Sequence, residues 1–152
     1  MAIRNVVKMG DPVLREKCRE VTEFNQRLWT LLDDMKETML YADGVGLAAP
    51  QVGILKRVCV ISRDGEHFYE LINPVITEKS GSQKNIEGCL SVPGKHGEVE
   101  RPLSMTVEAY DRYGVKQEYK LNGFMTVIFS HEIDHLDGTL YVDKVIGGLM
   151  ED

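Results

Sequence analysis

The sequence predicts an α+β fold in which mostly antiparallel strands surround one buried helix, with one amphipathic helix nearer the N-terminus. Three observations in the 152 residues predict it: a helical period over about 24–42, strand-like segments after it, and a helical segment before residue 136 that is apolar on nearly every side. Because the strands do not alternate one by one with helices, the pattern indicates α+β and not a β-α-β repeat.

The amphipathic helix is expected from about residue 24 to residue 42, and Asp43-Gly44 should end it. Apolar side chains recur at spacings of three and four, and polar residues fill the other face. We interpret this stripe as core packing. Its members are Phe24, Leu28, Leu31, Leu32, Met35 and Met39.

The region between the helices predicts two hairpins. Short apolar or alternating segments there are separated by turn residues, which is typical of antiparallel strands. The predicted strands cover 57–61, 67–72 with an extended continuation over 73–78, 104–110 and 115–121, joined by turns at 63–66 and 111–114. The chain from Thr139 onward is expected to be a short extended tail.

The second helix ends in His131-Glu132-Ile133-Asp134-His135. Asn122 is the expected N-cap, and Gly138 stands where helices commonly end. On a helix, His131 and His135 lie one turn apart on the same face, with the Glu132 carboxylate beside them. That geometry is typical of a two-histidine metal site with its own base. The alternative is a pair of hydrogen-bonded core histidines.

A metal site of this kind needs a third protein ligand. Cys59 lies in an apolar strand and is interpreted as a small buried hydrophobe, and Cys18 lies among charged residues on an expected solvated face. Cys89 lies within 87–94, where glycines and a proline are expected to break regular structure. It is therefore either a metal ligand or an ordinary loop cysteine.

A second glycine-rich segment covers 44–53 and contains one amide side chain, Gln51. It is interpreted as a tight connection from helix to strand. The alternative is a wall that faces a ligand, with Gln51 donating a hydrogen bond into a cleft.

Composition predicts a single domain over residues 1–152, with 43% hydrophobic and 28% charged residues. The net charge of −6 disfavours direct binding to nucleic acid, and the positive residues are scattered along the sequence. No apolar run is long enough for a membrane span, and the start lacks the apolar core of a signal peptide. We therefore expect a cytoplasmic protein with reduced cysteines.

Three segments together resemble the signature motifs of peptide deformylases, in order and at appropriate separations. They are Gly44-Val45-Gly46-Leu47-Ala48-Ala49-Pro50-Gln51, Glu87-Gly88-Cys89-Leu90-Ser91 and His131-Glu132-Ile133-Asp134-His135. The resemblance implies the fold of that family and the removal of the formyl group, as formate, from the N-terminal formyl-methionine of nascent polypeptides.

The resemblance also implies the metal site. Cys89, His131 and His135 would hold one divalent metal, Fe(II) in the cell, with Zn, Ni or Co able to replace it. Glu132 would take a proton from the attacking water and deliver it to the departing amine. The ligand types alone do not select iron, since a thiolate and two imidazoles suit several metals.

The same resemblance assigns the remaining site residues. The Gln51 side chain and the Leu90 backbone N–H would stabilise the negative charge on the formyl oxygen. Val45, Gly46 and Glu87 would help line the substrate cleft, and the face from Phe124 to Phe129 would contribute to a methionine pocket.

Two departures from the family pattern are present. Ser130 stands where many members have Gln, which is expected to alter hydrogen bonding beside the first histidine. The sequence ends without the basic C-terminal helix that some members use at the ribosome. We therefore expect a monomer that contacts the ribosome transiently, without such a helix.

Two other functions remain open on the sequence. One is a general H-E-x-x-H protease, whose third ligand would be a distant Glu or His. The other is a structural metal site or a silent binding module, for which His67 or His96 would have to supply a fourth ligand.

Overall fold

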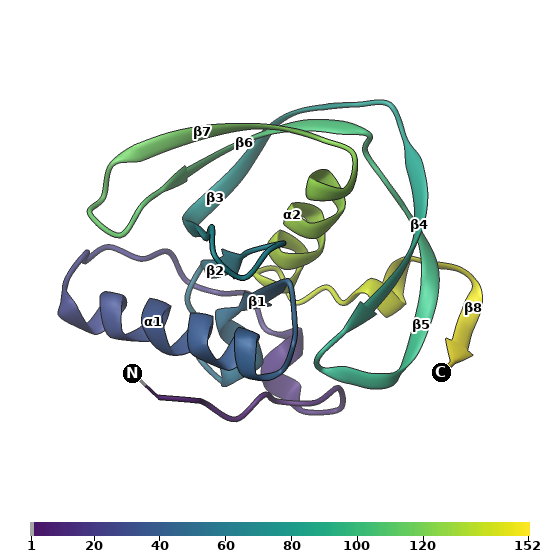
Figure 1. The fold of residues 1–152 in the computed structure, drawn as a ribbon, viewed down its shortest axis with the longest axis horizontal. Helices are drawn as coiled ribbons and strands as arrows, with labels where there is room; N and C mark the ends of the chain where they lie inside the picture. Colours follow the sequence, from purple (N-terminus) through teal and green to yellow (C-terminus); the bar gives the residue numbers. More distant parts are fainter. Residues whose placement is uncertain (1) are drawn as a thin grey trace.

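The computed structural model describes residues 2–152, and Figure 1 shows helix α2 lying between two sheets. The helices are α1, Gln26–Tyr41, and α2, Phe124–His135. Short 3-10 helices are η1, Pro12–Arg15, η2, Ala49–Val52, and η3, Tyr141–Lys144. The strands are β1 Gly46–Ala48, β2 Val58–Ile61, β3 Tyr69–Ser80, β4 Gln83–Cys89, β5 Val92–Arg101, β6 Ser104–Tyr110, β7 Lys116–Asn122 and β8 Val145–Glu151.

Both sheets are built from antiparallel neighbours. The larger has the order β1-β2-β3-β6-β7, and the smaller has the order β4-β5-β8. The predicted hairpin of β2 with β3 is confirmed, since Val58 pairs with Ile72 and Ile61 with Tyr69. The predicted hairpin of β6 with β7 is confirmed as well. The larger sheet arches over α2 in Figure 1, and β4 and β5 lie at its side.

Helix α1 packs its apolar face on β1 and β2. Asn25 caps its first turn by accepting a hydrogen bond from the backbone N–H of Leu28 at 3.3 Å. The helix ends at Tyr41, and Asp43 then adopts φ 60°. The stripe of leucines and methionines is buried, as core packing requires.

Helix α2 begins at Phe124, one residue later than an N-cap at Asn122 would place its start. The prediction of Asn122 as N-cap is wrong, because Asn122 is the last residue of β7 and Gly123 at φ 66° makes the turn into the helix. The end matches the expectation, because Gly138 has φ 76° and a Cβ there would meet the Arg15 carbonyl oxygen at 2.5 Å. Only glycine fits this close approach.

Two segments predicted to lack regular structure, and the predicted extended tail, take part in strand pairing. Residues 87–94 form the β4–β5 hairpin around Leu90 and Ser91, and 44–53 contains β1 and η2. The tail from Thr139 contains η3 and β8, which pairs with β5. The β4–β5 hairpin is local, but its glycines and proline indicated a break in regular structure. The partner of β8 is remote in sequence, so local composition did not reveal that pairing.

The interpretation of Cys18 as a residue on a solvated face is wrong. Its side chain is 5% exposed and belongs to the same core cluster as Cys59. Its backbone N–H donates to the Leu136 carbonyl at 2.8 Å, which holds this segment against the end of α2.

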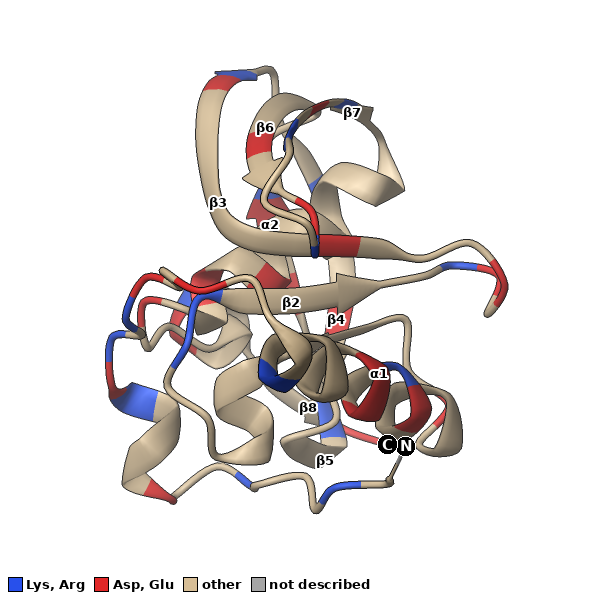
Figure 2. Cartoon of the chain, turned by 90° about the vertical axis from the view of Figure 1, so that its left-hand side faces the viewer, with Lys and Arg blue, Asp and Glu red and all other residues tan. Residues whose placement is uncertain are grey.

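Charged residues lie mainly on loops and on outward faces. In Figure 2 the strand β2 carries no charged residue, whereas α1 and the loops on this side carry both signs. Among residues 2–152, no helix combines the length and the apolar character that a membrane span requires.

Candidate active site

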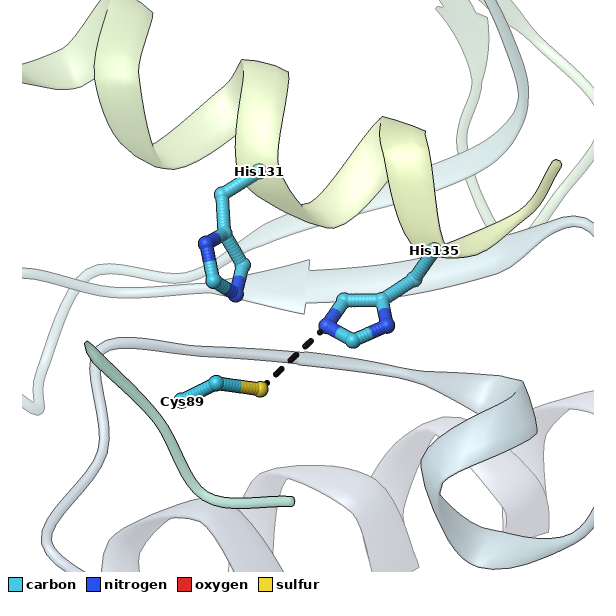
Figure 3. Close-up of side chains that lie close together, drawn as sticks. All are labelled: Cys89, His131 and His135. Carbon is cyan, nitrogen blue, oxygen red and sulfur yellow. Dashed lines mark hydrogen bonds between the residues drawn. The ribbon is translucent and has the colours of Figure 1, made fainter. Parts of the chain in front are cut away.

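Three potential metal ligands meet between α2 and the end of β4. Cys89, His131 and His135 each offer a ligand atom, and these atoms lie within 4.8 Å of one another. Cys89 Sγ is 3.5 Å from His135 Nε2, and Figure 3 shows the thiol and both imidazoles pointing toward one another. The structure thus brings together the three side chains that the sequence analysis selected.

Their positions follow from local structure. His131 and His135 are one helical turn apart, so their rings share one face of α2 with centroids 5.1 Å apart. Cys89 is the last residue of β4, where a bulge interrupts the pairing with β5 after Glu87. Such bulges turn side chains toward new directions.

Glu87 lines the cavity, but its carboxylate is hydrogen-bonded to buried side chains of the protein. It accepts two hydrogen bonds from Arg101, at 2.8 and 2.9 Å, and Oε1 lies 2.9 Å from His131 Nδ1. Burial raises the pKa of Glu87, but the hydrogen bonds from Arg101 and His131 outweigh it and lower the pKa to about 2. The ionised carboxylate of Glu87 thus holds the Nδ1 side of the His131 ring, and the opposite side of the ring faces Cys89 and His135.

Glu132 points its carboxylate into the same cavity. The side chain is 5% exposed, and its Oε1 has no hydrogen-bond partner. Burial raises the pKa of Glu132 to about 7, which lets the group both accept and return a proton near neutral pH. Gly46 makes room for it, because a Cβ at Gly46 would lie 2.5 Å from Glu132 Oε2.

Gln51 is buried with its amide directed at Cys89. Its Oε1 accepts from the Ala48 backbone N–H at 3.0 Å, and its Nε2 donates to Ser91 Oγ at 3.1 Å and lies 3.5 Å from Cys89 Sγ. These contacts fix the amide group with its Nε2 beside Cys89, one of the three candidate ligands. Leu90 is the neighbouring residue of the β4–β5 turn and lines the same cavity.

The cavity beside these groups has a volume of about 370 Å³. Val45, which is 42% exposed, stands on one wall, and Phe124, Val127 and Ile128 of α2 contribute an apolar wall. A polar end with an adjoining apolar wall fits an amide whose next group is an apolar side chain. All nine residues singled out in the sequence lie at or beside this cavity.

The donor set fits a divalent transition metal. One thiol and two imidazoles are borderline-soft ligands. Burial lowers the pKa of His135 well below 6.5, which favours the neutral imidazole that a metal requires. Burial also lowers the pKa of His131, but the contacts with Cys89, Glu132 and Glu87 outweigh it and raise that pKa to about 10, so a metal has to displace a proton from this ring. The Glu132 carboxylate beside these ligands has one buried oxygen without a hydrogen-bond partner. This oxygen is placed to accept a hydrogen bond or a proton from a molecule bound in the cavity. With three protein ligands, a position remains for water or substrate.

The spare histidines and thiols do not join this group among residues 2–152. His67 contacts Asp64 in an exposed loop, and His96 contacts Asp152 at the end of β8. Burial raises the pKa of Cys18 to about 11 and holds that of Cys59 well above its ordinary value, which favours the neutral thiol in both. The arrangement has three ligands, which argues against the closed structural site.

The sequence did not reveal the residues that hold the candidate ligands in position. Arg101 is 3% exposed and contacts Asp134 at 2.6 Å as well as Glu87, and the Tyr141 ring stacks on His131 with centroids 5.9 Å apart. Neither carries a local signal, because both act through partners distant in sequence. Ser130 donates to the Thr126 carbonyl at 2.7 Å, so its hydroxyl is satisfied within α2.

Comparisons with known proteins agree with one another. The family model described as polypeptide deformylase matches residues 3–148. Peptide deformylases of Caldicellulosiruptor bescii and Acetivibrio thermocellus are 51% and 53% identical over the whole chain, which covers 91% and 89% of their lengths. The crystal structure of the Thermotoga maritima peptide deformylase superposes with a TM-score of 0.93 at 39% identity, covering 96% of this chain and 99% of that one.

Proposed function

The chain belongs to the polypeptide deformylase family, an enzyme family of metal-dependent hydrolases, and we propose that residues 1–152 act as one catalytic domain that deformylates nascent polypeptides. The observation that carries the proposal is the convergence of Cys89, His131 and His135 beside the unpaired carboxylate of Glu132. The substrate is the N-terminal formyl-methionine, and the products are formate and a free amino terminus.

Cys89, His131 and His135 would hold the metal, which when bound supplies Lewis-acid polarisation of a carbonyl and a lowered pKa for water. We propose Fe(II) in the cell, with Zn, Ni or Co able to replace it. The mixed donor set supports a site for several first-row metals, and the choice of Fe(II) among them rests on the family resemblance. Glu87 and Arg101 keep the His131 ring in one orientation.

Glu132 performs the proton transfers in this proposal. Its carboxylate removes a proton from the attacking water and delivers it to the amine nitrogen as the C–N bond of the formamide breaks. A pKa of about 7 suits both directions of transfer. Gly46 leaves the carboxylate enough space to remain at the cavity surface.

Gln51 and Leu90 would stabilise the developing negative charge on the formyl oxygen. The Gln51 amide is held by Ala48 and Ser91, so it needs little rearrangement to donate from Nε2. Fixed donors of this kind are typically the largest single contribution to transition-state stabilisation. The Leu90 backbone N–H would be the second donor.

Substrate binding would use the two walls of the cavity. Val45 and Gly46 on one side, with Glu87 and its neighbours on the other, would flank the peptide, and the apolar face beginning at Phe124 would receive the methionine side chain. The substrate implies a cytoplasmic location and a transient contact with the ribosome. We propose a monomer, because one chain supplies every residue of the site.

The decisive experiment measures formate release from a short formyl-Met peptide. We expect turnover that stops when a chelator removes the metal and returns when Fe(II) is restored without oxygen. Glu132→Gln should keep the metal and lose turnover by a factor on the order of 10²–10⁴, the usual size of a general acid–base contribution. Full activity in that variant would exclude the role of Glu132.

Peptide assays also distinguish deformylase activity from general protease activity. Cleavage of an unformylated peptide at an internal bond would favour a general protease. Metal retained at one equivalent without formate release would favour a structural site.

A further inference from the structure

A cationic groove lies at the N-terminal end of α1, outside the catalytic cavity. Arg4, Arg19, Arg27 and Lys56 surround a depression of about 460 Å³. These four residues are far apart in sequence, so the scatter of positive charge along the sequence concealed them. We refer to this depression, with its four cations and its apolar floor, as the α1 groove.

The cations of the α1 groove are largely uncompensated. Arg4 is held by Asp34 at 2.9 Å, whereas Arg19, Arg27 and Lys56 have no carboxylate within 4.0 Å in the part of the chain that is described. No Asp or Glu lines the groove. In a chain with a net charge of −6, the groove is thus a local concentration of positive side chains.

The floor of the groove is apolar. Leu31 of α1 and the loop residues Ile54 and Leu55 form it. No aromatic side chain lines the groove, so it offers no platform on which nucleic-acid bases could stack. Cations around an aliphatic floor match a ligand that carries carboxylates and apolar side chains together.

The walls of the groove are fixed by backbone hydrogen bonds. The Arg19 N–H donates to the Leu55 carbonyl at 3.1 Å, and the Arg57 N–H returns a bond to the Arg19 carbonyl at 2.9 Å. The Arg4 N–H donates to Thr38 Oγ1 of α1 at 2.8 Å. A preformed surface of this kind binds with less ordering cost than a flexible one.

The α1 groove and the catalytic cavity share no residue. The cavity is bordered by Asp43 and Gly44 just beyond the C-terminal end of α1, whereas Arg27 lies in the first turn of that helix. Sixteen helical residues at 1.5 Å each separate the two ends by roughly 24 Å. A ligand in the groove would leave the cavity open.

We propose that the α1 groove docks an acidic segment of a partner protein that carries aliphatic side chains between its carboxylates. The carboxylates pair with Arg19, Arg27 and Lys56. The aliphatic side chains cover the half-buried Ile54 and Leu55, beside the buried Leu31. This binding is additional to deformylation and holds the enzyme to a partner while the catalytic cavity stays accessible.

The test measures binding of a short fluorescein-labelled peptide that alternates Glu and Leu, by fluorescence anisotropy at low salt. Peptides of the same length that alternate Lys and Leu, or Glu and Ser, control for charge sign and for the apolar floor. The variant is Arg19→Glu with Arg27→Glu. The matched control is Lys79→Glu with Lys120→Glu, which makes the same charge change at two exposed lysines on β3 and β7.

We expect the Glu-Leu peptide to bind the native enzyme and to bind R19E/R27E on the order of tenfold or more weakly, because two attractive contacts become repulsive. Binding to K79E/K120E should be unchanged, and formate release should be equal in all three proteins. Equal binding to both double variants, or no binding to the native enzyme, would overturn the proposal. Tighter binding of an oligouridine at the same residues would overturn the partner class.

Discussion

Glu87 Oε1 lies 2.9 Å from Nδ1 of His131, and the same carboxylate is clamped by the buried guanidinium of Arg101. Glu87 thereby orients His131, one of the proposed metal ligands. From the sequence, Glu87 was expected only to line the substrate cleft. The carboxylate acts from behind the imidazole, so its contribution should be visible in metal binding.

Glu87→Gln should weaken binding of the divalent metal about 10- to 100-fold, because the His131 ring loses its charged anchor. Titration against a competing chelator measures this directly. Asp134→Asn is the matched control, since Asp134 contacts Arg101 but its side chain does not bond to His131. An equal loss in both variants would show that the network acts only on stability.

Gly46→Ala should lower formate release about a hundredfold while the fold is retained. The added Cβ would lie 2.5 Å from Glu132 Oε2 and must displace the proposed base, and displacements near 1 Å can cost this much. Gly88→Ala is the control in the same cavity, because its Cβ would meet its first neighbour, the Lys95 carbonyl oxygen, at 3.7 Å. Comparable losses in both variants would contradict the steric argument.

Gly138→Ala should lower the free energy of unfolding by about 1–3 kcal/mol, measured by denaturant titration. The residue has φ 76°, and its Cβ would meet the Arg15 carbonyl oxygen at 2.5 Å. Gly53→Ala isolates the backbone part of this cost, since Gly53 has φ 81° with nothing within 4 Å of its Cβ. A loss at Gly138 no larger than that at Gly53 would remove the role of the contact.

Glu70 should stabilise the fold at neutral pH and lose that effect in acid. Burial raises its pKa, but hydrogen bonds from Arg112 and Lys36 outweigh it and hold the pKa below its ordinary value of 4.5. A carboxyl group with a lowered folded-state pKa contributes above its unfolded pKa, and the contribution disappears as pH falls through the folded value.

The stability difference between the native protein and Glu70→Gln should therefore be largest above pH 4.5 and shrink below it. Denaturant titrations across this range measure the difference. Glu20→Gln, at an exposed position with no ion pair among residues 2–152, should show little difference at any pH. If the stability difference between the native protein and Glu70→Gln persists at low pH, the effect of Glu70 comes from packing and not from its ionised carboxylate.

The sequence by itself determined the features that depend on near neighbours. The period of α1, the hairpins of β2 with β3 and of β6 with β7, and the shared face of His131 and His135 all follow from spacing along the chain. The candidate ligands could be named for the same reason, because their residue types are rare and their motifs short.

Only the tertiary structure decided the features that join distant segments. It placed Cys89 beside the two histidines, joined the Glu87 carboxylate to Arg101, and buried Cys18 in the core. It also paired β8 with the remote strand β5 and gathered the cations of the α1 groove. Charge pairing, burial and strand pairing depend on separations in space, which the order of residues in one chain does not state.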